Sequence, residues 1–168
     1  MAPGKASGYA AVIEAVEYLL RAIELGAGTV RSGRGGPFGA VIVRGAAIIG
    51  EGANSVIALR DPTAHAEVQA IRDACARVRN FSLAGATLYA SSEPCPMCLA
   101  AIYWARIESI VFASPRTAAA RAGFDDSVFY DELAKDPAER AVPMRQLELP
   151  EGLALFDEWM AKGDKVRY

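Results

Sequence analysis

One histidine and two cysteines constrain the fold of this chain more than any other residues. His65 is followed by Glu67, and further along the chain runs Pro94-Cys95-Pro96-Met97-Cys98. One imidazole, two thiolates and one carboxylate are the groups that a catalytic zinc site uses: three protein ligands, an open fourth position and a general acid/base. His65 is the only histidine in the sequence, and it lies inside this pattern. A shared ion requires the two segments to meet in space.

The spacing within each segment predicts how they meet. In a Cys-x-x-Cys pair on a helix, the two sulfurs lie on one face. In the first turn, unpaired N–H groups and the positive end of the helix dipole favour the thiolate. We expect His65 in the first turn of its own helix, so that two helix N-termini face one ion. His65 and Glu67 are about 200° apart on a regular helix, which places the site beside the helix start, where both can reach it.

The formal charges predict separate roles for the ligands and for Glu67. Zn²⁺ with two thiolates and one neutral imidazole is neutral, so a carboxylate ligand is not needed. Bound water can then reach a pKa of about 7. Glu67 is therefore predicted to take the proton of that water and pass it to the substrate nitrogen.

Two other interpretations of the cysteine pair stay open. Cys-x-x-Cys alone also occurs in structural zinc half-sites and in redox pairs. A structural site normally needs a fourth Cys or His, and only Cys75, which we expect to be a small buried hydrophobic residue on a helix, is left to supply one. A non-catalytic binding module that keeps zinc for structure is the alternative of a different class, and it predicts that Glu67 is dispensable.

Composition predicts one compact domain over residues 1–168, with residues 1–7 disordered. Hydrophobic residues make up 52% of the chain and charged residues 23%, as in compact globular proteins. The net charge of −2 favours a small-molecule substrate over a nucleic acid, which usually requires a basic surface. No apolar run is long enough for a membrane span. With no signal-peptide pattern at the N-terminus and an odd number of cysteines, we expect a cytoplasmic protein.

Apolar periodicity and turn residues predict alternating helices and strands. The predicted fold class is α/β, a three-layer α/β/α sandwich around a five-stranded mixed sheet. Helices are expected over Tyr9–Leu25, where Gly26 and Gly28 end the first, from Asp61-Pro62 to about Val78, over Cys95–Ala105, Thr117–Arg121, Tyr130–Lys135 and Leu153–Met160. Strands are expected over Phe38–Val43 and Ala47–Ile49, which form a hairpin around Arg44-Gly45, and over Ala86–Ala90, Ile107–Ala113 and Met144–Leu149.

Longer segments resemble a known enzyme family. The pattern H-x-E followed by P-C-x-x-C is typical of zinc nucleobase deaminases. Gly36-Pro37-Phe38-Gly39-Ala40-Val41-Ile42-Val43, Asp61-Pro62-Thr63-Ala64-His65-Ala66-Glu67-Val68 and Glu93-Pro94-Cys95-Pro96-Met97-Cys98 resemble the cytidine-deaminase superfamily. Ala101-Ile102-Tyr103-Trp104-Ala105-Arg106, Ala122-Gly123-Phe124-Asp125-Asp126-Ser127 and Arg167-Tyr168 resemble bacterial guanine deaminases. The resemblance runs from about Tyr9 to Tyr168. One difference is that the stretch 29–35 is longer than expected for this family, either as a flap or as a plain surface loop.

The resemblance implies hydrolysis of guanine to xanthine and ammonia, with zinc-bound hydroxide attacking C2. It makes His65, Cys95 and Cys98 the Zn²⁺ ligands and Glu67 the catalytic residue. It also implies a homodimer in which the C-terminal segment, about residues 150–168, is exchanged between subunits. The residues that it implies for substrate binding are Asn54, Phe38, Trp104, Asp125, Asp126, Tyr168 and Ala66.

Each substrate residue also has a plainer interpretation. Phe38 and Trp104 can be core or interface residues, and Asn54 an ordinary turn residue. Asp125 and Asp126 can form a solvated turn, and Tyr168 a frayed chain end. Two rival activities share the zinc pattern: a guanosine deaminase, whose pocket must admit a ribose, and a tRNA adenosine deaminase, which requires a basic surface.

Overall fold

The chain forms two compact units, residues 1–126 and residues 127–168. The structure, a computed structural model, describes residues 5–167, with side chains from residue 12 onward. The single domain expected over residues 1–168 stays a prediction.

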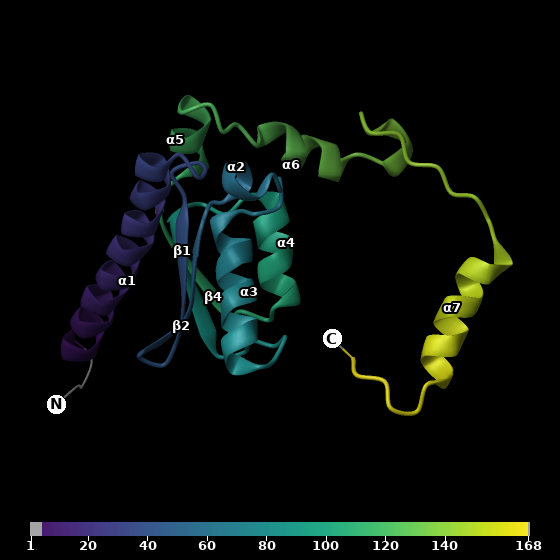
Figure 1. Cartoon of the computed structure of the whole chain (residues 1–168), viewed down its shortest axis with the longest axis horizontal. Coiled ribbons are helices and arrows are strands. Elements are labelled where there is room, and N and C mark those ends of the chain that lie inside the picture. Colours follow the sequence, from purple (N-terminus) through teal and green to yellow (C-terminus); the bar gives the residue numbers. More distant parts are fainter. Residues whose placement is uncertain (1–4, 168) are drawn as a thin grey trace. The chain divides into compact units, whose positions relative to one another are not determined.

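A four-stranded mixed sheet forms the centre of the first unit (Figure 1). Its order is β2-β1-β3-β4, with β1 antiparallel to both β2 and β3, and β3 parallel to β4. The strands span Gly39–Arg44 (β1), Ala47–Ala53 (β2), Ala86–Ser92 (β3) and Ser109–Ser114 (β4). The predicted hairpin is confirmed, and Gly45 adopts the positive φ of 61° that its tight turn requires.

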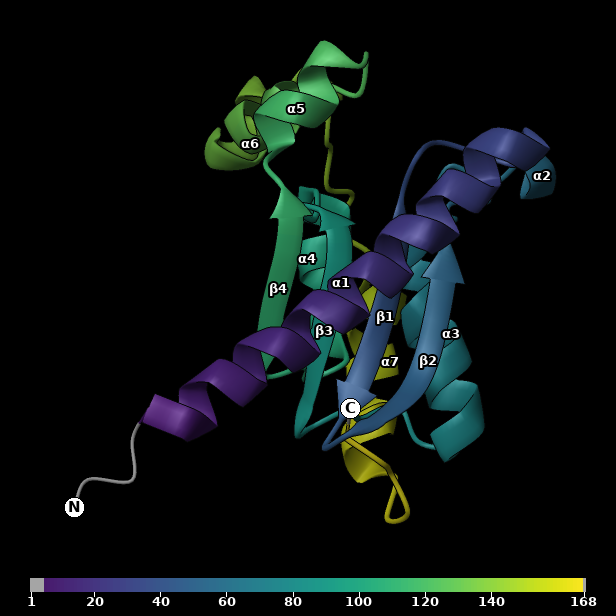
Figure 2. The same cartoon turned by 90° about the vertical axis from the view of Figure 1, so that its left-hand side faces the viewer.

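Helices cover both faces of this sheet, which confirms the three-layer arrangement in this unit (Figures 1 and 2). The helix α1 (Lys5–Ser32) crosses one face, and α3 (Ala66–Val78) and α4 (Pro96–Trp104) cover the other. Alternate residues of β1 separate the two cores. Ala40 and Ile42 pack with α3 and α4, whereas Val41 and Val43 pack with α1. This period of two is what the pleat of a strand imposes.

The first helix is longer than predicted. Gly26 and Gly28 do not end α1, which continues to Ser32. Gly26 instead lies against the start of β1, where a Cβ atom would come within 2.8 Å of the Pro37 carbonyl oxygen. At Gly39 a Cβ atom would overlap the backbone of α1 at Ala22 and Gly26. These two glycines therefore permit a close helix–strand contact, a role that outweighs the tendency of glycine to end helices. The N-terminal residues expected to be disordered overlap α1 at residues 5–7, and residues 1–4 lie outside the described part.

The two helices with the cysteine and histidine motifs begin at the same end of the sheet. Prediction placed the start of α3 at Asp61-Pro62, but the helix begins at Ala66. The Asp61 carboxylate accepts bonds from the backbone N–H of Thr63 at 2.8 Å and from its hydroxyl at 2.7 Å. These local bonds close a turn, and so they compete with helix formation. In α4, by contrast, the predicted helix start near Cys95 is confirmed.

Shorter helices complete the first unit near the motifs. The stretch 54–60 contains the single turn α2 (Val56–Leu59). The helix α5 (Arg116–Arg121) follows β4, as predicted. Within the described residues, no helix has both the length and the apolar character that a bilayer crossing demands.

The second unit contains only helices and connecting segments among its described residues. These are α6 (Ser127–Ala134), the 3₁₀ turn η1 (Pro137–Glu139) and α7 (Pro150–Ala161). The prediction of a fifth strand over Met144–Leu149 is wrong, and the described sheet has four strands. A strand needs a neighbouring backbone to pair with, and this unit has no strand among its described residues to supply one.

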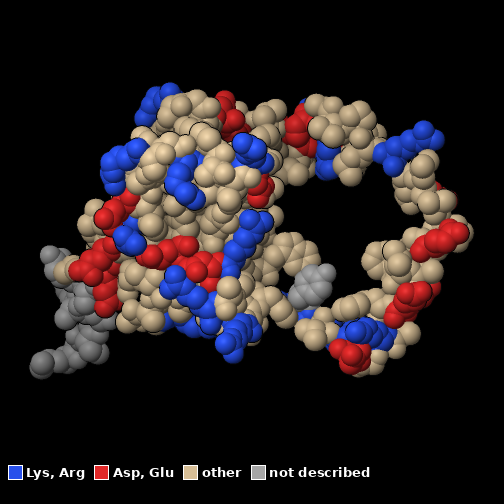
Figure 3. Space-filling model, viewed as in Figure 1, with Lys and Arg blue, Asp and Glu red and all other residues tan. Residues whose placement is uncertain are grey.

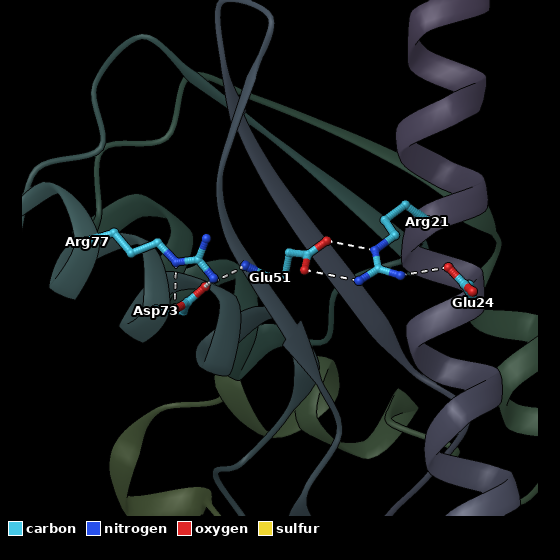
Figure 4. Close-up of polar contacts among 5 residues, drawn as sticks. All are labelled: Arg21, Glu24, Glu51, Asp73 and Arg77. Atoms are coloured by element: carbon cyan, nitrogen blue, oxygen red, sulfur yellow. Dashed lines mark hydrogen bonds and ion pairs between the residues drawn. The ribbon is translucent and has the colours of Figure 1, made fainter.

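A row of charged contacts crosses the edge strand β2 (Figure 4). Arg21 of α1 bonds the Glu51 carboxylate through Nε at 2.7 Å and through a terminal nitrogen at 3.2 Å. The backbone N–H of Glu51 donates to Asp73 of α3 at 3.0 Å, and Asp73 also pairs with Arg77. The edge strand is thereby connected to the helices on both faces, and one of its outward N–H groups is satisfied.

Candidate metal centre and the residues around it

His65, Cys95 and Cys98 meet at the N-terminal ends of α3 and α4. The Nδ1 atom of His65 lies 3.6 Å from the Cys95 sulfur and 3.5 Å from the Cys98 sulfur. All three ligand atoms lie within 4.8 Å of one another. A tetrahedral zinc with its usual Zn–S and Zn–N bond lengths separates sulfur and nitrogen by about 3.6 Å. The three side chains therefore have the spacing that a zinc ion requires.

Local backbone geometry explains this convergence. His65 and Cys95 are the N-cap residues of α3 and α4, with extended backbone ψ values of 156° and 167°. An N-cap side chain lies beside the helix axis rather than on a helix face. The spacing of His65 and Glu67 is therefore not a helical i, i+2 spacing, because only Glu67 lies within the first turn of α3. This resolves the 200° separation that a regular helix would impose.

The contact between the two thiols shifts their pKa values in opposite directions. The hydrogen bond from Cys98 lowers the pKa of Cys95 to about 4, while the same contact raises the pKa of Cys98. The hydrogen bond to Cys95 also raises the pKa of His65. A divalent cation is the kind of partner that would hold both sulfurs as thiolates. Cys75 lies outside this cluster, and its sulfur contacts the Phe81 carbonyl oxygen at 3.8 Å.

Glu67 is a buried carboxyl group beside the candidate metal site. Only 8% of the residue is exposed, and burial is the main reason that its pKa is raised. The negative charge of Cys95 also raises this pKa, which shows that the carboxyl group is within electrostatic reach of the sulfurs. A carboxyl group that holds a proton more readily than in water is suited to proton transfer near neutral pH.

Asn54 and Phe38 lie next to the metal motif. The Asn54 N–H donates to the Phe38 carbonyl oxygen at 2.9 Å, and the next N–H, of Ser55, donates to Ala64 at 2.9 Å. Asn54 is 4% exposed, so it is not an ordinary exposed turn residue. Ala66, the first residue of α3, is fully buried, and its N–H lies in the first turn, where no intrahelical acceptor exists.

Phe124 lies near the site, but no sequence pattern predicted a function for it. Its ring meets that of Phe38 edge to face, with centroids 4.9 Å apart and an interplanar angle of 84°. Together the two rings form an apolar contact next to Asn54. The position of Phe124, directly before the predicted substrate residues Asp125 and Asp126, was the one sequence signal that could have identified it.

The other predicted substrate residues are less clearly related to the metal centre. Burial raises the pKa of Asp126, and the charge of Cys95 raises it further, so this carboxylate is close enough to interact with the centre. Asp125 contributes in the same direction. Trp104 lies at the far end of α4, about 13 Å along the helix from Cys95, with 66% of its surface exposed. Tyr168 lies outside the described residues. The substrate roles of all these residues stay predictions.

The surface charges are mixed in sign. On the face shown in Figure 3, basic and acidic side chains are both present, and neither kind covers the face. Nucleic-acid-binding proteins usually concentrate Lys and Arg along one face. The charges on this face therefore do not favour a polynucleotide substrate.

Comparisons with known proteins agree with this geometry. Residues 13–114 match the cytidine and deoxycytidylate deaminase zinc-binding region. Guanine deaminase from Bacillus subtilis is 50% identical over 151 residues, which are 90% of this chain and 97% of that protein. Its solved structure superimposes with a TM-score of 0.88 over the same shares of the two chains.

More distant relatives match a smaller part of the chain. The guanine deaminase structure from Nitrosomonas europaea is 30% identical, with a TM-score of 0.62, over 66% of this chain and 64% of that chain. The tRNA-specific adenosine deaminase of Aquifex aeolicus is 47% identical over 78 residues, which are 46% of this chain and 52% of that protein. Similarity to that tRNA-specific enzyme is thus limited to less than half of the sequence.

Proposed function

The chain belongs to the cytidine and deoxycytidylate deaminase zinc-binding family, and we propose that it hydrolyses guanine to xanthine and ammonia. The observation that carries this proposal is the pair of distances from the His65 nitrogen to the two cysteine sulfurs, 3.6 and 3.5 Å, beside a buried carboxyl group. The choice of guanine is supported by the relative that matches 90% of the chain, in contrast to the tRNA-specific enzyme that matches 46%.

His65, Cys95 and Cys98 would hold Zn²⁺ through one nitrogen and two sulfurs, a donor set that suits this ion. When bound, the zinc would supply an activated water molecule to the carbon that bears the amino group. Glu67 moves the two protons of that water one after the other. The first goes to the ring nitrogen, and the second, taken from the hydroxyl group left on the carbon, goes to the departing ammonia. The burial of Glu67 beside the sulfurs excludes bulk water from these transfers and raises its proton affinity.

The residues around Glu67 orient the purine ring. Phe38, together with Phe124, offers an apolar wall against the ring face. The Asn54 amide donates to an acceptor on the ring, and the N–H of Ala66 is a second donor. Asp126, supported by Asp125, accepts from the N–H edge of the purine, while Trp104 and Tyr168 close the pocket. Of these, Asn54 and Phe38 are held next to each other by the bond between their backbones.

The protein acts as a cytoplasmic homodimer in which residues 150–168 are exchanged between subunits. Exposed apolar side chains of α7 support this part of the proposal, since Leu153, Phe156 and Met160 are each more than 60% exposed in the single chain. Apolar surface of this kind is normally covered by a partner. Light scattering of the purified protein measures its mass in solution. A monomeric mass at micromolar concentration would exclude the exchange.

Ammonia release from a panel of guanine, guanosine, adenine, cytosine and cytidine tests the proposed activity. We expect release from guanine, with a much lower rate from guanosine because its ribose must also fit. A preference for guanosine would identify a nucleoside deaminase with the same chemistry. If none of the five compounds released ammonia from zinc-loaded protein, the proposed function would be wrong.

A further inference from the structure

Thr29 is a buried polar side chain in the stretch 29–35, for which the sequence predicts either a flap or a plain surface loop. It lies in the last turn of α1 and is 3% exposed. Its hydroxyl oxygen lies 2.7 Å from the Gly26 carbonyl oxygen and 2.5 Å from the Gly36 carbonyl oxygen. The contact with Gly26 is the usual bond of a helical threonine to the preceding turn. The hydroxyl group has one proton for these two acceptors. The contact with Gly36 is the shorter, and it joins the helix to the following loop.

Gly36 in turn holds the side chain of Asn54. The Gly36 N–H donates to the Asn54 Oδ1 atom at 3.1 Å, and the Val56 N–H donates to the same oxygen at 3.3 Å. Neighbouring Gly35 has no room for a side chain, because a Cβ atom there would overlap the amide and backbone of Asn54. The loop and the asparagine are therefore packed directly on one another.

These bonds determine which way the Asn54 amide faces. Two N–H donors on one atom identify that atom as the oxygen and use both of its lone pairs. The amide nitrogen, Nδ2, must then point away from the loop with its two protons. Among the described residues, no acceptor for Nδ2 is found. Nδ2 is not among the fully enclosed side-chain atoms that lack a partner, so it keeps some exposure although Asn54 as a whole is only 4% exposed. A donor placed in this way is suited to bind an acceptor on a ligand.

We propose that Thr29 is a positioning residue for the substrate. It fixes the Gly36 carbonyl, the Gly36 N–H fixes Oδ1 of Asn54, and Nδ2 is thereby held ready for an acceptor atom of the purine ring. The inference rests on the proposed function, in which Asn54 contacts the substrate. In this proposal the stretch 29–35 helps to position Asn54, because the extension of α1 to Ser32 brings Thr29 to the loop.

A double-mutant cycle with Thr29→Val and Asn54→Ala tests this chain of contacts, with initial rates measured on guanine. Valine has the shape of threonine but lacks the hydroxyl group. We expect Thr29→Val to lower kcat/KM about threefold to tenfold, the value of one hydrogen bond. The loss should appear mainly in KM, because the contact exists in the ground state and the transition state alike. In the Asn54→Ala background, Thr29→Val should change kcat/KM less than twofold.

Two single variants serve as controls. Thr29→Ser keeps the hydroxyl group and should restore most of the loss. Ser32→Ala removes another hydroxyl group of the same helix turn. This group is exposed and contacts only backbone carbonyl oxygens of the helix, Gly28 at 2.8 Å and Thr29 at 3.3 Å, so its removal should leave KM unchanged. Additive effects of Thr29→Val and Asn54→Ala would overturn the inference, as would a serine variant no better than valine.

A measurement without substrate separates this inference from the proposed function. In ¹⁵N-labelled protein, the side-chain amide signal of Asn54 should shift in Thr29→Val and stay in place in Ser32→Ala. An unshifted signal would disprove the link between Thr29 and Asn54, whatever the substrate is. If wild-type protein shows no turnover of guanine, the proposed function fails, and the amide signal still decides whether Thr29 orients Asn54.

Discussion

At the scale of single residues, Glu67 has the role that can be tested most directly. It contributes no ligand atom to the candidate zinc site, which has His65, Cys95 and Cys98. Its burial raises its pKa, and a structural zinc module would have no use for such a group. We therefore predict that Glu67→Gln retains zinc and melting temperature but lowers kcat by a factor of about 10²–10⁴. Metal analysis and turnover of the same sample check this, and near-normal turnover would favour the non-catalytic module.

The cysteines provide a second test with a built-in control. Cys98 is fully buried and lies 3.5 Å from the His65 nitrogen, whereas Cys75 lies near the other end of α3 and is not part of the cluster. Cys98→Ala should therefore purify without stoichiometric zinc, and Cys75→Ala with it. Metal content by mass spectrometry is the measurement. If Cys98→Ala kept a full complement of zinc, the ligand set would have to be revised.

The metal centre was the part of the site that the sequence predicted best. A single histidine and one cysteine pair left few combinations, and the expected meeting of two helix starts is what the structure has. The contacts of Phe124 and Thr29 could not be predicted in the same way. Both depend on packing between distant segments, Phe124 on Phe38 and Thr29 on Gly36, and neither belongs to a pattern of fixed spacing.

At the scale of elements, helix and strand types followed from periodicity, but several boundaries did not. Gly26 and Gly28 favour the end of a helix in isolation, yet α1 continues past both of them. The close contact with the start of β1 at Gly26 stabilises the helix in this region. The Met144–Leu149 segment has suitable residues for a strand, but a strand also requires a partner. Boundaries of this kind depend on tertiary packing, which local patterns do not report.

The two glycines of α1 should respond to alanine in opposite ways. A Cβ atom at Gly26 would press on the backbone of Pro37 and Phe38, whereas at Gly28 it would meet nothing within 4 Å. We predict that Gly26→Ala lowers the free energy of unfolding by about 1–3 kcal/mol. Gly28→Ala should raise it by about 0.5–1 kcal/mol, because alanine favours the helical conformation. Urea denaturation of the pair measures both, and equal effects would contradict the close contact of α1 and β1.

The Arg21–Glu51 pair connects α1 to the edge strand and should make stability depend on pH. The hydrogen bond from Arg21 lowers the pKa of Glu51 below its ordinary value of 4.5. A lowered pKa contributes stability that is present above the unfolded-state pKa and is lost as the pH falls through the folded-state pKa. Glu51→Gln should therefore lower the melting temperature by about 1–3 °C at pH 7, and the difference should diminish towards pH 3.

Thermal melts of both proteins from pH 3 to pH 7 measure this convergence. Glu24→Gln is a matched control, because Glu24 also pairs with Arg21 but its side chain is 64% exposed. It should have the smaller effect. A Glu51→Gln difference that stayed constant across this range would show that the carboxylate charge does not stabilise the fold.

At the scale of the whole molecule, the proposed exchange of residues 150–168 can be tested by mixing two defective subunits. One variant carries Glu67→Gln with an intact C-terminus, and the other lacks Tyr168 but retains Glu67. Each alone should have low activity on guanine, although both should bind zinc. In a mixed dimer with exchanged segments, the intact Glu67 of one subunit would meet the intact C-terminus of the other. One of the two sites would then be complete.

Co-expression with two different affinity tags isolates the mixed dimers. We predict that they recover about half of the wild-type turnover per dimer, because one complete site forms by exchange. Without exchange, each site would be closed by its own chain, and both sites of a mixed dimer would keep their defect. Recovery therefore requires residues from two chains in one site, and activity no higher than that of the parent variants would show that each chain completes its own site.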